Sequence, residues 1–325
     1  MNNKIVVSNM MRAKNKQSFF ALHQLHSKIK NNCPDCDIEF HILWDENYEL
    51  ASDDNKKWEE LIDNYGFNIV SYDKEFFINY ASQTYGLPYN DIKEKSKKFI
   101  PLFLILMAHY LRRVKLYDYY LIYDDDVLIN YDFKDITEYL KQHRPVLINE
   151  PFNVNCDKVF FNKLIDIHGS NFYDIYRTKN PDMLGFNAGF QGIDLSIYDQ
   201  FLSKDRFKFL LSLFNYSGIY DKDGKEIWGN ERFIIDTQQQ SFFSLMNVVL
   251  SRNELAILDP EYYYVAPSWG EHPRFGKINP DDELHGWGVC LSSRISHFIG
   301  HTHGKGKPKE FIDKVDEYLK INNFL

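Results

Sequence analysis

The fold of this chain is decided by the stretch Tyr119-Tyr120-Leu121-Ile122-Tyr123-Asp124-Asp125-Asp126-Val127-Leu128-Ile129. A short continuous apolar run is typical of a strand buried on both faces, as in a mostly parallel sheet. Carboxylates are rarely buried unless they are paired or bind metal, and open α/β sheets bind ligands at the carboxyl ends of their strands. Because residues at i and i+2 of an extended segment share a face, Asp124 and Asp126 can bind one hard cation such as Mg2+ or Mn2+. The alternative is a solvated acidic turn.

The chain before this stretch alternates between strand and helix patterns. The pattern predicts a strand at 5–7 that turns at Ser8 and Asn9, a helix at 18–29, a strand at 38–44, a helix at 58–65 and a strand at 67–70. This βαβαβ order predicts an α/β fold with a parallel sheet. No Gly-x-Gly-x-x-Gly or Walker loop follows the first strand, so neither a dinucleotide site nor an NTPase site is supported.

The rest of the chain adds four further elements. They are a buried helix at 99–111, a strand at 145–148, a helix at 241–249 and a strand at 295–300. Between them, Gly185 and Gly192 bracket a tight strand-like unit. Its glycines indicate either close packing or a functional site.

Composition limits the partners and the compartment. The 325 residues are 44% hydrophobic and carry a net charge of -8, which disfavours duplex nucleic acid or an anionic membrane as general partners. The apolar segment 99–111 is too short to span a bilayer, and no signal peptide is visible, so a soluble, cytoplasmic protein is expected. Cys33-Pro-Asp-Cys36 is a lone pair that favours a loop, with a local disulfide as the alternative to free thiols.

Two motifs resemble one family of enzymes. The segment from Tyr123 to Ile129 is similar to the Asp-x-Asp segment of GT-A nucleotide-sugar glycosyltransferases. Near the end of the chain, His301-Thr302-His303-Gly304-Lys305-Gly306-Lys307-Pro308 fits His-x-x-Gly-x-x-Lys-Pro, a hallmark of the retaining group that includes glycogenin and the lipooligosaccharide galactosyltransferases. Lys309 departs from the family, which usually has Trp there.

The resemblance implies a single Rossmann-like GT-A domain over residues 1–325, α/β in class, with a central mixed, mostly parallel sheet. Residues 1–130 would form the nucleotide-binding half that ends in Asp-x-Asp, and residues 131–325 the acceptor half with a C-terminal metal and phosphate loop. The implied enzyme is a hexosyl- or pentosyltransferase that uses Mn2+ or Mg2+. It would move a sugar from a nucleotide donor, UDP-linked by expectation, to a hydroxyl of a glycan, glycoprotein or other acceptor, with retention.

The resemblance also implies particular site residues in this chain. The metal ligands implied are Asp124, Asp126 and His301, with His303 and His297 as competitors for the imidazole role. The nucleotide and phosphate contacts implied are Ser8, Asn9, Lys98, Asp125, Gly304, Lys305 and Lys307. The residues implied beside the transferred sugar are Asp236, Gln239 and Asn187. Some of these residues have a plainer interpretation. Asp236 can be a helix cap, Lys98 can belong to a solvated lysine run, and residues 301–308 can form a flexible loop.

Three alternatives stay open on the sequence. An inverting transferase would use Asp236, Glu231 or Asp194 as a general base. A sugar nucleotidyltransferase would need a Gly-rich basic loop after the first strand, where this chain has only Ser8 to Arg12. The third is a catalytically silent carbohydrate- or nucleotide-binding module. Acceptor specificity would lie in the less periodic segments 149–181 and 262–287.

Overall fold

The structure is a computed structural model, and it describes only part of the chain. The described residues are 4–11, 31, 37–44, 63, 69–98, 100–123, 127–129, 134–153, 171–182, 184–186, 189–213, 243, 246–258, 263–266, 271–272, 276–277, 295–298 and 320–321.

The largest sheet holds five strands in the order β3-β2-β1-β4-β8. Their bounds are β1 Lys4–Met11, β2 Asp37–Trp44, β3 Ile69–Tyr72, β4 Tyr119–Tyr123 and β8 Phe190–Asp194. The first four strands are parallel, and β8 pairs antiparallel with β4. The acidic stretch therefore follows β4, an interior strand that pairs with β1 on one side and with β8 on the other. Its apolar composition is typical of such a buried strand.

Three smaller sheets complete the described strands. One has the order β10-β13-β5, from Tyr263–Ala266, Ile295–Phe298 and Val127–Ile129. A second has the order β7-β6-β9, from Leu184–Phe186, Val146–Asn153 and Ala256–Leu258. The third is the two-stranded pair β11 Glu271–His272 and β12 Gly276–Lys277.

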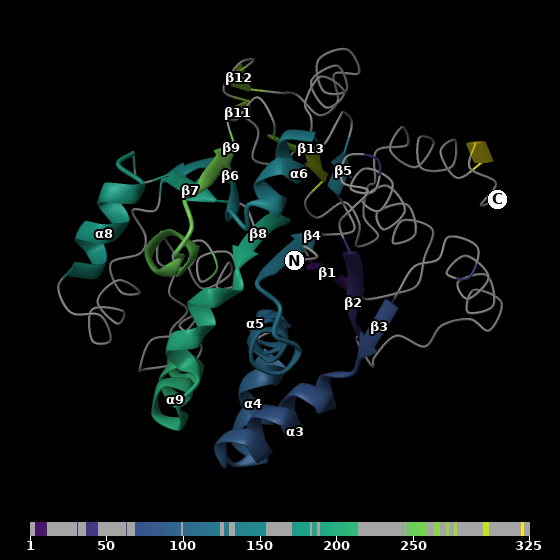
Figure 1. Ribbon diagram of the computed structural model, residues 1–325, viewed down its shortest axis with the longest axis vertical. Helices are drawn as coiled ribbons and strands as arrows, with labels where there is room; N and C mark the ends of the chain where they lie inside the picture. The colour runs from purple at the N-terminus through teal and green to yellow at the C-terminus, as the bar shows by residue number, and fades with distance from the viewer. Residues whose placement is uncertain are drawn as a thin grey trace.

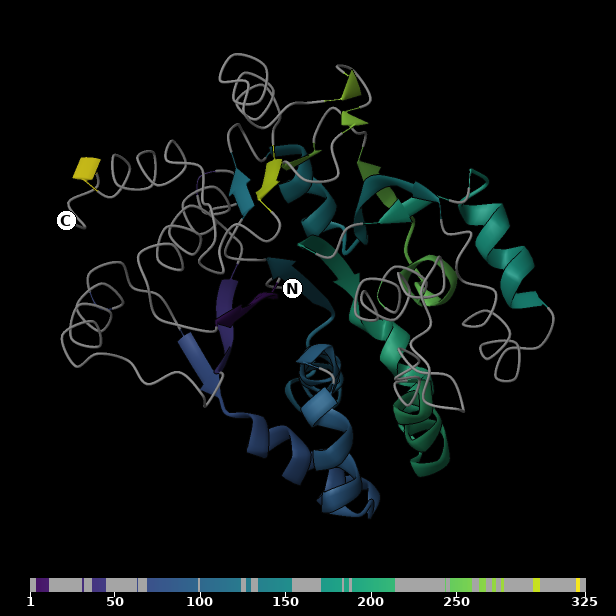
Figure 2. The ribbon, with the colours of Figure 1, turned by 180° about the vertical axis from the view of Figure 1, so that it is seen from behind.

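Helical segments lie between these strands. They are α3 Lys74–Tyr85, α4 Tyr89–Lys98, α5 Ile100–Tyr110, the π-helical turn η1 Leu111–Lys115, α6 Lys134–Lys141, α8 Asn171–Lys179, the 3-10 segment η3 Leu195–Phe201 and α9 Lys204–Leu213. Figures 1 and 2 show α3, α4, α5 and α9 at one end of the molecule, with β5, β13, β11 and β12 at the other. Helix α3 begins at the Asp73 cap and ends at Gly86, whose φ of 58° suits a residue without Cβ.

The core is aromatic and packs β4 against the helices. Residues 103–108 of α5 are all buried, as are Tyr120 and Ile122 of β4. The ring of Tyr85 from α3 stacks on Phe207 from α9, with centroids 3.9 Å apart. The high aromatic content therefore serves core packing in this part of the chain.

The α/β class predicted from the sequence is confirmed. The predicted central sheet is one of four among the described residues. Strand β3 lies at 69–72 instead of 67–70, and α5 spans 100–110 with a π-helical turn after it. The helix predicted at 18–29 lies outside the described residues, as do Cys33 and Cys36.

Two expectations are corrected. Ser8 and Asn9 lie inside β1, since parallel pairing with β2 continues to Met11, opposite Trp44. Backbone pairing does not depend on side-chain polarity, so two polar residues do not end the strand. The segment 149–181, expected as loops, holds the end of β6 and all of α8.

No helix within the described ranges is long and apolar enough to cross a membrane. The cytoplasmic location stays a prediction.

Candidate active site

Three strand ends meet at one edge of the five-stranded sheet. β4 ends at Tyr123, directly before Asp124. Because β1 is parallel to β4 with Ser8 opposite Ile122, Ser8 and Asn9 lie at this same edge. β8 is antiparallel to β4 with Phe190 opposite Tyr123, so β8 begins where β4 ends. The two strands that pair with β4 thus both come from regions singled out in the sequence.

A strand from the C-terminal part of the chain lies beside β5, the strand that follows the acidic stretch in sequence. β5 begins at Val127, directly after Asp126, and pairs antiparallel with β13. His297 lies opposite Val127, so the carboxyl end of β13 lies at the start of β5. Figure 1 shows β13 beside β5. The chain that leads to His301 therefore leaves its strand next to the point where the acidic segment enters β5.

Local sequence explains this geometry. Residues 119–122 are at most 1% exposed, which fits a strand covered on both faces. Gly192 of β8 makes room for its neighbour on β4, because a Cβ at Gly192 would lie 1.5 Å from the Tyr119 Oη. For Gly192, close packing is the interpretation that the structure supports.

The predicted site residues divide into three groups. Ser8 and Asn9 are described and lie at the edge where β4 ends. Lys98 is the last residue of α4, and no strand pairing places it at this edge. The remaining candidates, together with the competitors His303 and Glu231, lie outside the described residues: Asp124, Asp125, Asp126, Asn187, Asp236, Gln239, His301, Gly304, Lys305 and Lys307.

His297 lies inside β13, within the strand predicted at 295–300. It lies opposite Val127, the residue that follows Asp126 in the sequence. Among the three candidate histidines, it is the one whose backbone position the structure describes.

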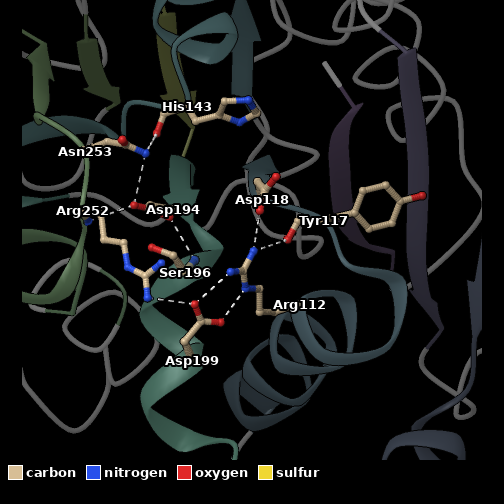
Figure 3. Close-up of polar contacts among 9 residues, drawn as sticks. All are labelled: Arg112, Tyr117, Asp118, His143, Asp194, Ser196, Asp199, Arg252 and Asn253. Carbon is tan, nitrogen blue, oxygen red and sulfur yellow. Dashed lines mark hydrogen bonds and ion pairs between the residues drawn. The ribbon is translucent and has the colours of Figure 1, made fainter. Parts of the chain in front are cut away.

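Asp194 cannot be the general base that the inverting alternative allowed. It pairs with Tyr119 at the amino end of β4, about 13 Å along the strand from Tyr123. Its side chain is buried, and both carboxylate oxygens accept hydrogen bonds. The donors are the Ser196 N–H at 2.9 Å, the Ser251 hydroxyl at 2.8 Å and the Arg252 N–H at 3.1 Å. Figure 3 shows Asp194 with three residues that donate to it, Ser196, Arg252 and Asn253. This carboxylate therefore fixes structure at the edge opposite the candidate site.

Arg112 links two carboxylates at the same edge of the sheet as Asp194. Its guanidinium donates to Asp199 at 2.7 and 2.9 Å and to Asp118 at 2.5 Å (Figure 3). The hydrogen bond from Arg112 is the main cause that lowers the pKa of Asp199. Sequence reasoning missed this network, since Arg112 and Asp199 stand 87 positions apart without a shared motif.

The donor set predicted for a metal suits Mn2+ or Mg2+, because two carboxylates and an imidazole are ligands that such ions accept. Among the described residues, no cluster of three or more His, Cys, Asp or Glu side chains forms a metal site. The described strand pairings bring together the ends of the segments that carry the predicted ligands.

Comparison with known proteins gave matches to solved structures only. No family model and no curated protein matches this chain. Mouse xyloside xylosyltransferase 1 in its apo form has a TM-score of 0.44 and 12% identity, over 92% of this chain and 99% of that one. The mannosyltransferase Ktr4p from S. cerevisiae has a TM-score of 0.46 and 10% identity, over 79% of this chain and 68% of that one. An active-site mutant of LgtC has a TM-score of 0.40 and 12% identity, over 97% and 95%.

The chain is similar to these three structures. With TM-scores of 0.46 or less and identities of 12% or less, they do not define its family.

Proposed function

We propose that this chain is a metal-dependent GT-A glycosyltransferase that moves a sugar from a UDP-linked donor to an acceptor hydroxyl with retention. One observation supports the proposal: β5, which follows the Asp-x-Asp segment in sequence, pairs with β13, which precedes the C-terminal motif in sequence. The two strands are more than 160 positions apart in sequence, so their pairing is not a consequence of local sequence. Open α/β sheets bind ligands at the carboxyl ends of their parallel strands, where β1 and β4 end here.

The proposed ligands of the cation are Asp124, Asp126 and His301. A bound divalent cation would supply positive charge to the diphosphate of the donor. In the same loop, Lys305 and Lys307 would bind diphosphate oxygens, and Gly304 would let backbone N–H groups approach them closely. Such fixed cations stabilise the negative charge that develops as the nucleotide leaves.

The rest of the donor would contact residues from the first half of the chain. Ser8 and Asn9 would lie against the base, Asp125 against the ribose side, and Lys98 would add positive charge. Asp236, Gln239 and Asn187 would orient the sugar and stabilise positive charge at its anomeric carbon. With retention, no basic carboxylate is required beneath the acceptor.

Two alternatives are kept. An inverting transferase would now depend on Asp236 or Glu231, since Asp194 is fully bonded at the opposite edge. The anomer of the product, observed by NMR, separates inversion from retention. A silent binding module would bind the nucleotide without hydrolysing or transferring the sugar.

The test is donor hydrolysis by the full chain across UDP- and GDP-sugars, with Mn2+ and with EDTA. Metal-dependent release of one nucleotide is expected. Asp126→Asn should lose it, and comparison of His301→Ala with His297→Ala identifies the imidazole ligand. Absence of hydrolysis across the panel, with no nucleotide binding by calorimetry, would refute the proposal.

A backbone variant tests the strand pairing itself. Ser296 lies in the middle of β13, between β10 and β5. Ser296→Pro removes a backbone donor from a central strand and should lower donor hydrolysis at least tenfold, whereas Ser296→Ala keeps the donor and should stay active. Equal activity of the two variants would show that this pairing does not hold the site.

A further inference from the structure

An exposed apolar corner lies at the other edge of the sheet, where α5 leads into β4. Residues 113–116 are all exposed, with Val114 48% and Leu116 75% exposed. Leu202, 39% exposed, belongs to the same corner, because the Arg113 Nη1 donates to the Leu202 carbonyl at 3.0 Å. We call residues 113–116 and Leu202 the Leu116 corner.

The backbone holds Leu116 outward. The turn η1 closes with hydrogen bonds from the N–H groups of Leu116 and Tyr117 to the Leu111 carbonyl. Leu116 then adopts φ 59° and ψ 34°, a left-handed conformation that leucine rarely takes. The next residue, Tyr117, is buried. A leucine that is both in an unfavourable conformation and exposed gains nothing from folding alone, so a surface that covers it would offset this cost.

Cations lie directly beside the exposed aliphatic side chains of the corner, although the whole chain has a net charge of -8. Arg113 and Lys115 flank Val114, and the Arg113 guanidinium lies over the Tyr85 ring at 4.9 Å. Lys204 lies beside Gly86, the residue after Tyr85. The nearby carboxylates of Asp118 and Asp199 are both paired with Arg112. Glu39 interacts electrostatically with Lys115, and Asp205 is exposed next to Lys204.

We propose that the Leu116 corner docks on an anionic lipid surface. Val114 and Leu116 would enter the interfacial layer of the bilayer, while Arg113, Lys115 and Lys204 would face lipid phosphates. Exposed aliphatic side chains flanked by cations are the composition that binds such surfaces. The corner lies at the amino end of β4, opposite the candidate active site, so the proposal does not depend on the proposed function.

The test is sedimentation of the full chain with vesicles of phosphatidylcholine, with or without phosphatidylglycerol. We expect binding only to the anionic vesicles at low salt and its loss at about 0.5 M salt. Lys115→Gln should weaken binding about fivefold. Leu116→Gly should weaken it about tenfold, and glycine accepts the left-handed conformation, so this variant should stay folded.

A matched control lies on α8, where Ile175 and Arg177 are also exposed. Ile175→Ser and Arg177→Gln should bind like the parent protein. The proposal is wrong if anionic vesicles do not sediment the protein at low salt, or if Leu116→Gly and Lys115→Gln bind as the parent does. Self-association through this corner without vesicle binding would likewise overturn it and assign the surface to a protein contact.

Discussion

The absence of a side chain at Gly192 allows β8 to lie beside β4. Gly192 faces Tyr119, and a Cβ there would come within 1.5 Å of the Tyr119 Oη and 3.1 Å of the Val146 backbone nitrogen. Tyr119 is fully buried, so its ring has no free space to move into.

Gly192→Ala should therefore destabilise the protein by on the order of 2 kcal/mol, measured by urea unfolding. Combining it with Tyr119→Leu removes the clashing ring, so the double variant should lose less than the sum of the two single losses. Simple additivity would mean that the two residues do not touch.

Asp194 is the second residue whose role depends on its surroundings. Asp194→Asn would place an amide where buried N–H and hydroxyl groups now donate to a carboxylate, and it should lower the free energy of unfolding by about 3 kcal/mol. Donor turnover per folded molecule should stay unchanged.

The exposed Asp118 serves as the control, and Asp118→Asn should change stability by less than about 1 kcal/mol. If Asp194→Asn abolished turnover without loss of stability, Asp194 would be catalytic after all.

At the scale of elements, one buried histidine joins four helical segments. His109 of α5 has its Nδ1 3.2 Å from the Tyr80 Oη and its Nε2 3.1 Å from the Tyr85 Oη and 3.3 Å from the Phe201 carbonyl. Its ring also packs against Phe207 of α9. Because a carbonyl only accepts, Nε2 carries the proton and Nδ1 accepts from Tyr80. Burial lowers the pKa of His109 from 6.5 to about 4, and the charge of Arg113 contributes in the same direction.

This histidine should make the fold sensitive to acid. Between pH 6.5 and about pH 4, the unfolded chain binds a proton at His109 that the folded chain does not, so stability falls as pH falls through this window. The loss amounts to on the order of 3 kcal/mol. Burial also lowers the pKa of His41 to about 4, which adds a second contribution of the same sign. His109→Gln should therefore remove about half of the pH dependence of the urea midpoint between about pH 7 and about pH 5.

Tyr80→Phe provides the control for this prediction. It removes the hydrogen bond to Nδ1 but keeps the titrating ring, so it should lower stability at both pH values without flattening the dependence. An unchanged pH dependence in His109→Gln would show that other groups cause the acid sensitivity.

At the scale of the molecule, the two halves of the chain share sheets. β8 from the second half pairs with β4 from the first, and β13 near the C-terminus pairs with β5. Neither half can complete these sheets by itself.

Fragments 1–130 and 131–325, produced separately, should therefore each lack a cooperative unfolding transition, and mixing them should restore one. Circular dichroism during heating measures this. A cooperative transition in fragment 1–130 alone would contradict the single-domain organisation, which stays a prediction.

The sequence by itself determined the α/β class, the buried strand Tyr119–Tyr123 and the existence of the three strands before it, because hydrophobic periodicity is a local property. It also singled out the acidic segment, since three carboxylates between apolar runs need a reason. The roles of the proposed metal and catalytic residues stay predictions.

Only the tertiary structure decided which strands are neighbours. That Phe190 lies opposite Tyr123, that His297 lies opposite Val127, and that Asp194 lies opposite Tyr119 at the amino end of β4 all follow from pairing between distant segments. The long strand at Ser8 and Asn9 likewise depends on its partner β2. Backbone hydrogen bonds are the same for every residue type, so register is set by packing across the whole fold and not by the local sequence.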